Sequence, residues 1–160
     1  TVLENLLVAQ HQHLNNSLLA GLFKTRSYRQ AEKEALDSAV FWLEKVRLVE
    51  DANREAGTLA YGQQRRLEIA RCMVTRPSLL MLDEPAAGLN PSETDELKQL
   101  IKDLRDNHGI SVLLIEHDMK LVMDISDHIV VINQGTPLAS GTPEQVRNNP
   151  AVIKAYLGED

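Results

Sequence analysis

Residues 79–85 read Leu-Leu-Met-Leu-Asp-Glu-Pro, an apolar run followed by two adjacent acids and a proline. A short, continuous apolar run bounded by polar residues is typical of a strand that is buried on both faces of a parallel sheet. In open α/β sheets, ligands bind at the carboxyl ends of the strands. The stretch therefore predicts an α/β fold and, at Asp83 and Glu84, a candidate functional site.

Two further apolar runs, Val-Leu-Leu-Ile at 112–115 and Ile-Val-Val-Ile at 129–132, predict two more strands. A helix is predicted between the first two strands, because Asn90 can cap it, Pro91 suits the first helical position and Glu93 completes a capping box. Strand–helix–strand is the βαβ unit of an α/β sheet.

The remaining segments complete two predicted parts. After the third strand, a turn leads to a short strand near residues 136–140, and two short helices follow. Residues 76–160 should therefore form a mostly parallel sheet with flanking helices. Residues 1–75 should form a helical subdomain with a loop near residues 15–27. Its predicted helices span residues 1–12, 28–49 and 63–75.

The amino-acid composition limits the classes of protein to which this chain can belong. The chain has 160 residues, of which 43% are apolar and 25% charged, in the ordinary range of soluble globular domains. A net charge of −6 gives no electrostatic reason to expect nucleic acid as a partner. Cys72 is the only cysteine, so no internal disulfide can form, which fits a reducing compartment. The apolar runs are far shorter than a membrane span.

The acids of the first strand are matched by a histidine after the second. Asp83 is a candidate ligand for Mg²⁺, and Glu84 is a candidate general base for an attacking water. Residues 115–118 read Ile-Glu-His-Asp, which places His117 at the predicted edge where Glu84 lies. The alternative is that two acids merely end a strand and that the histidine is structural or solvated.

A third motif lies upstream, where residues 59–66 read Leu-Ala-Tyr-Gly-Gln-Gln-Arg-Arg. Gly62 at the start of a helix would let a phosphate approach the free N–H groups and the positive end of the helix dipole. Arg65, Arg66 and Arg71 form a basic face, which we expect to pair with acids of the helical part.

Together these motifs resemble the ATP-binding cassette (ABC) ATPases. In that family a signature close to Leu-Ser-Gly-Gly-Gln precedes the Asp-Glu-Pro strand by one helix. A loop of the type Ser-Gly-Leu-Asp-Pro follows the strand, present here at residues 87–91 as Ala-Gly-Leu-Asn-Pro. A histidine follows the next strand. The resemblance covers essentially the whole chain and implies a P-loop NTPase fold, with ATP and Mg²⁺ as cofactors.

The resemblance also implies a role for each motif. Glu84 would orient the water, Asp83 would serve Mg²⁺ and His117 would contact the γ-phosphate. The signature would complete the nucleotide site of the opposite subunit, and the loop after Pro85 would be the family's D-loop. The signature residues are Ala60, Tyr61, Gly62 and Gln63, and the D-loop residues are Gly88, Leu89 and Asn90.

Finer similarity points to one branch of the family. Residues 59–62, 86–91, 115–119 and 155–158 are similar to the ATPase subunits of branched-chain amino-acid importers. This similarity implies a second ATPase subunit in a sandwich dimer, permease subunits, an indirectly linked periplasmic binding protein and no nucleic acid. The implied location is peripheral, at the cytoplasmic face of the bacterial inner membrane.

The chain also departs from the family pattern. It contains no Gly-x-x-x-x-Gly-Lys-Ser/Thr loop and begins with Thr1, so we expect a C-terminal portion that is inactive by itself. Ala60 replaces a serine that would contact the γ-phosphate, Tyr61 replaces a glycine, and Asn90 replaces an acid. A non-transport ABC-type ATPase and a catalytically incompetent interaction module remain the alternative functions.

Overall fold

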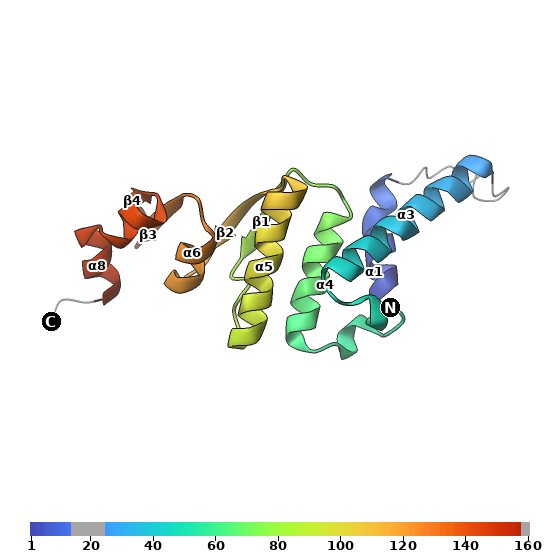
Figure 1. Cartoon of the computed structure of the whole chain (residues 1–160), viewed down its shortest axis with the longest axis horizontal. Coiled ribbons are helices and arrows are strands. Elements are labelled where there is room, and N and C mark those ends of the chain that lie inside the picture. Colours follow the sequence, from blue (N-terminus) through green and yellow to red (C-terminus); the bar gives the residue numbers. More distant parts are fainter. Residues whose placement is uncertain (14–24, 158–160) are drawn as a thin grey trace. The chain divides into compact units, whose positions relative to one another are not determined.

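A computed structural model describes residues 1–13 and 25–157 (Figure 1). Most of the predicted loop at 15–27 lies outside these residues. So does residue 158, the last residue of the segment 155–158 that is similar to importer ATPases. Helices and strands alternate after residue 78, which confirms the predicted α/β class. The chain divides into two compact units, Thr1–Leu113 and Leu114–Asp160. The predicted division between residues 75 and 76, based on the change from helical to strand-like patterning, stays a prediction.

Helices make up the first part of the first unit, as the sequence predicted. They are α1 (Val2–Ala9), η1 (Gln10–His13), α3 (Arg26–Lys45), η2 (Val49–Asp51), η3 (Ala56–Thr58) and α4 (Tyr61–Met73). Thr1 caps α1 by accepting a hydrogen bond from the Glu4 amide, and Thr25 caps α3 in the same way through the Tyr28 amide. These local caps explain where both helices begin.

The helices α1, α3 and α4 pack around a shared apolar core that includes Leu6, Leu43 and Leu67. The buried amide of Gln10 donates to the Ala35 carbonyl at 2.9 Å and so joins the end of α1 to α3. Two N–H groups in the first turn of α1 donate to the carbonyls of residues 52 and 54, both at 2.9 Å. These hydrogen bonds pair backbone and side-chain groups at both ends of α1 with neighbouring elements.

The strand–helix–strand unit follows as β1 (Leu79–Asp83), α5 (Pro91–His108) and β2 (Ser111–Ile115), and β1 and β2 are neighbours in a two-stranded sheet. The helix α5 begins as predicted, because Asn90 and Glu93 exchange hydrogen bonds of 3.0 Å in a capping box. It ends at Gly109, whose φ of +64° is the left-handed conformation that glycine adopts readily.

The prediction that these strands are buried on both faces is wrong for the described residues. Side chains along β1 and β2 alternate between covered and exposed. Leu80 is 4% exposed, whereas its neighbours Leu79 and Met81 are 50% and 68% exposed, and Leu113 of β2 is 52% exposed. We call Leu79, Met81 and Leu113 the bare face. An apolar run alone does not say which faces other elements cover.

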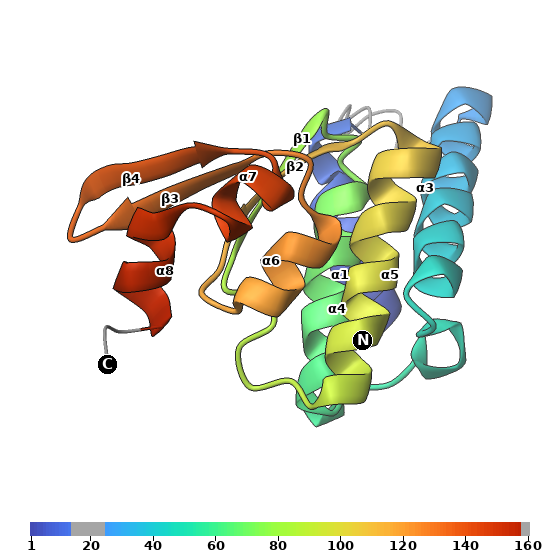
Figure 2. The same cartoon turned by 60° about the vertical axis from the view of Figure 1, so that its left-hand side comes forward.

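The second unit has its own small core. Its elements are α6 (Met119–Ile125), β3 (Ile129–Asn133), β4 (Thr136–Gly141), α7 (Pro143–Arg147) and α8 (Pro150–Leu157), shown in Figure 2. The strands β3 and β4 pair antiparallel, from Ile129 opposite Gly141 to Asn133 opposite Thr136. Ile129, Val131, Val146 and Val152 form the core. No helix among the described residues combines the length and apolar character that a membrane span requires.

Candidate functional site

The two acids lie at the end of β1, as predicted, and both are exposed. Glu84 has a φ of +43°, in the left-handed region that few residues other than glycine adopt. Its carbonyl accepts a hydrogen bond of 3.1 Å from the Ala87 amide, which closes a turn directly after the strand. Such strained conformations cluster at functional sites. The backbone thus presents the Glu84 side chain from a tight, hydrogen-bonded turn.

The loop after Pro85 is also held by local contacts. The Leu89 amide donates to the Ala86 carbonyl at 3.1 Å, and Gly88 has a φ of +77°. Asn90 then ends the loop as the cap of α5, with its carbonyl accepting from the Thr94 hydroxyl at 3.1 Å. Asn90 therefore has a structural task as a helix cap, one that the acid usual in this family could also perform.

The signature residues form the start of α4. Ala60 stands at the cap position but has no side-chain acceptor, so the first N–H groups of this helix lack a side-chain cap. Gln63 is engaged at both ends: its oxygen accepts from the Ala60 amide at 3.1 Å, and its nitrogen donates to Asp51 at 3.1 Å. The N-terminus of α4 is thus a preformed helix end with uncapped donors.

The structure brings the signature and the D-loop together within the first unit. Gly62 is buried, and a Cβ added there would collide with the Glu93 carboxylate of α5. A Cβ added at Gly88 would stand 3.2 Å from Cε1 of Tyr61. The absence of side chains at both glycines therefore permits α4 and the start of α5 to lie this close.

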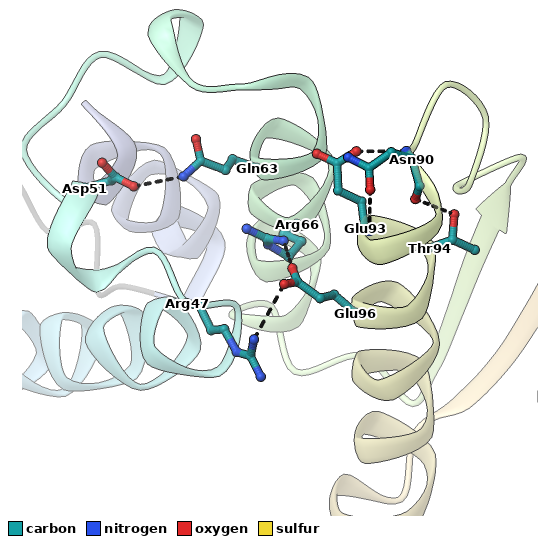
Figure 3. A network of polar contacts seen from close by, with 8 residues as sticks. All are labelled: Arg47, Asp51, Gln63, Arg66, Asn90, Glu93, Thr94 and Glu96. Atoms are coloured by element: carbon teal, nitrogen blue, oxygen red, sulfur yellow. Dashed lines mark hydrogen bonds and ion pairs between the residues drawn. The ribbon is translucent and has the colours of Figure 1, made fainter.

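An ion pair joins the same two helices one turn further along, and a second ion pair links α5 to Arg47, just after the end of α3, as Figure 3 shows. Glu96 of α5 forms a close ion pair with Arg66 of α4, and its other oxygen lies 3.6 Å from the guanidinium of Arg47. Arg66 is only 16% exposed. The predicted basic face is therefore paired in part with the helical bundle, through Arg65 and Glu68, and in part with α5.

Tyr61 is held in place by its own helix. Its hydroxyl accepts hydrogen bonds of 3.0 and 2.8 Å from the guanidinium of Arg65, which also lies 5.2 Å from the centre of the ring. Hydrogen bonds to Glu68 and then to Tyr61 raise the pKa of Arg65. Arg65 therefore carries a positive charge beside Tyr61 at neutral pH.

His117 belongs to the second unit, at the start of the segment that leads into α6. Its side chain is 73% exposed, while the side chain of the preceding Glu116 is 1% exposed. Asp118 caps α6 by accepting from the Lys120 and Leu121 amides at 2.9 and 3.2 Å. Glu84 lies in the other unit, so the predicted proximity of Glu84 and His117 stays a prediction.

Asp83 could supply one ligand of a magnesium site but not the complete site. Within residues 1–13 and 25–157, no group of three or more His, Cys, Asp or Glu side chains is arranged to hold a metal ion. A single exposed carboxylate agrees with the usual mode of Mg²⁺ binding, in which one or two carboxylates act together with substrate phosphates and water. Asp83 therefore fits the role of one oxygen ligand.

The sequence did not identify two residues that shape this site. Glu93 was predicted as a helix cap, but it also fills the space above Gly62. Glu96 was not singled out, although it joins α4 to α5. A signal for Glu96 was available, because it lies one turn after Glu93 on the face of α5 that Glu93 presents to α4.

Comparisons with known proteins agree with these motifs. A family model described as ABC transporter matches residues 3–87. Another, described as branched-chain amino acid ATP-binding cassette transporter, matches residues 136–160. The high-affinity branched-chain amino acid transport ATP-binding protein BraF of Pseudomonas aeruginosa is 74% identical over 99% of this chain and 62% of its own length. The corresponding protein LivG of Escherichia coli is 70% identical over the same shares.

Solved structures give the same assignment. The ADP conformation of an ATP-binding cassette of an ABC transporter has a TM-score of 0.78 and 33% identity, and the match covers 99% of this chain and 63% of that one. A nucleotide-free cassette has a TM-score of 0.76 and 32% identity, covering 99% and 63%. The chain thus spans less than two thirds of the length of these relatives. Because the first family model covers more than half of the chain, the chain belongs to the ABC transporter family.

Proposed function

We propose that this chain is part of the ATP-hydrolysing subunit of a branched-chain amino-acid importer. The observation that carries the proposal is the identity of 74% over 99% of the chain to a protein named for this transport. The geometry agrees with it, because a helix N-terminus with uncapped donors and a strand followed by two acids are two of the parts that a phosphate-hydrolysing site uses.

In this proposal each motif has one task. Glu84 orients the attacking water and accepts its proton, and His117 contacts the γ-phosphate. Asp83 supplies an oxygen ligand to Mg²⁺, which when bound neutralises charge on the phosphates. The signature residues Ala60–Gln63 form the helix start that faces a nucleotide held by a second ATPase subunit. The backbone donors come from Tyr61, Gly62 and Gln63, because the Ala60 amide donates to the Gln63 side chain.

The proposed partners follow from the same assignment. A second ATPase subunit would complete the sandwich dimer, permease subunits would bind the helical part, and a periplasmic binding protein would deliver the amino acid to them. The complete subunit would then be peripheral, at the cytoplasmic face of the bacterial inner membrane. A non-transport ATPase of the same family is the rival, and membrane association of the subunit on co-expression with permease subunits separates the two.

Hydrolysis by a complete subunit, of the length of the relatives, tests the proposed catalytic roles. Glu84→Gln should lower kcat by roughly 10²–10⁴-fold, the usual contribution of a positioned acid–base group, and leave ATP binding nearly intact. His117→Ala should cause a comparable loss, and the double variant should be little worse than either, because groups that act as a unit lose their effects non-additively. Asp83→Asn should instead weaken Mg²⁺-dependent binding.

The matched control is Glu144→Gln, which neutralises an exposed acid in the first turn of α7. Its turnover should equal that of the wild type. Near-full turnover of the Glu84→Gln variant would remove the catalytic assignment and favour the interaction module.

A further inference from the structure

The side chain of Tyr61 occupies a position between the signature and the D-loop. Its ring edge lies beside the α-carbon of Gly88, with Cε1 3.2 Å from the place where a Cβ would stand. Gly88 has a φ of +77°, so the loop passes the ring in a conformation that only glycine adopts without strain. Tyr61 and Gly88 are thus complementary in shape.

Contacts on the far side of the ring fix its direction. Two hydrogen bonds from Arg65 to the Tyr61 hydroxyl, at 3.0 and 2.8 Å, hold the tip of the side chain against its own helix. Arg65 is itself anchored to Glu68 at 2.9 Å. Tyr61 is 47% exposed, so these contacts with Arg65 are what oppose a rotation of the ring away from the loop.

A second contact fixes the base of the loop. One oxygen of Glu93 accepts from the Asn90 amide at 3.0 Å, and the other lies above Gly62 of the signature. Glu96 and Arg66 join the same helices one turn further on (Figure 3). The start of α4 therefore contacts the D-loop through Tyr61 at Gly88, and it contacts the first turn of α5, directly after the loop, through Gly62 at Glu93.

We propose that Tyr61 is a positioning residue for the D-loop, so that the start of α4 and residues 86–90 move as one rigid body. Tyr61 replaces the small residue of the common signature, and its ring fills the space that this residue would leave beside Gly88. Displacement of the signature is then transmitted directly to the D-loop. This inference concerns contacts within one chain and does not depend on which substrate is transported.

Hydrogen exchange in a complete subunit tests the inference without requiring activity. The amides of Ala87 and Leu89, which donate to residues 84 and 86, report on the order of the loop. Tyr61→Ala should raise their exchange rates by roughly tenfold, about 1.4 kcal/mol. Tyr61→Phe keeps the ring beside Gly88 but removes the two hydrogen bonds from Arg65, so it should retain only part of the protection. Unchanged exchange in the alanine variant, or equal loss in the phenylalanine variant, would overturn the proposal.

A pair of glycine substitutions separates ring contact from backbone strain. Gly88→Ala introduces backbone strain and a close contact with the Tyr61 ring. Gly135→Ala introduces backbone strain alone, because Gly135 has a φ of +79° and nothing lies within 4 Å of the added Cβ. Gly88→Ala should therefore raise loop exchange, and it should do so by a smaller factor when Tyr61 is already alanine. Equal factors in both backgrounds would contradict a contact between the two residues.

Turnover provides a second readout of the same positioning role. If the subunit hydrolyses ATP, Tyr61→Ala should lower kcat several-fold with little change in KM, and Tyr61→Phe, which keeps the ring but not the hydroxyl contacts, should show a smaller loss. An enzyme with no measurable hydrolysis would count against the proposed function, while the exchange result would still decide the role of Tyr61.

Discussion

Replacing Met81 with lysine should weaken self-association of this chain while leaving its folding nearly intact. Met81 is 68% exposed and belongs to the bare face, together with Leu79 of the same strand and Leu113 of the neighbouring strand. Exposed apolar patches of this kind on a sheet favour association between copies. A charged side chain at this position would have to be desolvated when two bare faces meet.

The magnitude follows from how much of the side chain is already exposed. Full burial of a methionine contributes about 2 kcal/mol, so the third that is buried contributes well below 1 kcal/mol to folding. The exposed two thirds would contribute about 1.4 kcal/mol to association, or roughly a tenfold change in the dissociation constant. Folding should therefore change little and association substantially.

Sedimentation velocity over a range of concentrations measures the association, and the thermal midpoint measures folding. Val8→Lys is the matched control, since Val8 is 72% exposed but lies on α1, away from the bare face. Leu80→Lys is the opposite control, because Leu80 is 4% exposed and its replacement should abolish folding. An unchanged dissociation constant for the Met81 variant, or an equal change for the Val8 variant, would refute the reasoning.

Two further predictions concern nucleotide and pH. The 160-residue chain should not bind ATP tightly, because it contains no phosphate-binding loop; a Mg²⁺-dependent rise in its melting temperature with millimolar ATP would contradict this. Hydrogen bonds from Asn107 and then Lys45 lower the pKa of Asp103. The ionised Asp103 therefore stabilises the folded state above the pKa of the unfolded chain, about 3.9. This stabilisation is lost as the pH falls through the lower pKa of the folded state. Asp103→Asn should therefore reduce the denaturation midpoint at neutral pH, and the difference from the wild type should shrink as the pH falls through the lowered folded pKa.

Local signals in the sequence predicted the elements of the fold well. The capping box of Asn90 and Glu93 needs only residues within one turn, and the structure contains it as predicted. Thr142 and Gln145 form a similar cap at α7, where a short helix was expected. Short apolar runs likewise identified β1, β2 and β3. Each of these features depends on neighbours in the sequence.

Features that depend on distant residues were not accessible in the same way. Leu79 and Leu80 are equally apolar, and only the arrangement of other elements leaves the first exposed and the second buried. Arg66 was expected to pair within the helical part, but its partner Glu96 lies thirty residues further along the chain. The contact of Gly62 with Glu93 joins two motifs that sequence reasoning treated as separate.

The left-handed backbone at Glu84 has a consequence for protein engineering. A non-glycine residue in this conformation costs about 1–2 kcal/mol, so glycine or asparagine at position 84 would relieve strain in the turn. A screen that rewards only thermal tolerance would therefore favour replacing this residue and would select a more robust protein without its carboxylate. Stability thus favours glycine or asparagine at position 84, whereas the proposed hydrolysis requires glutamate there. Libraries built from this chain should therefore keep position 84 fixed.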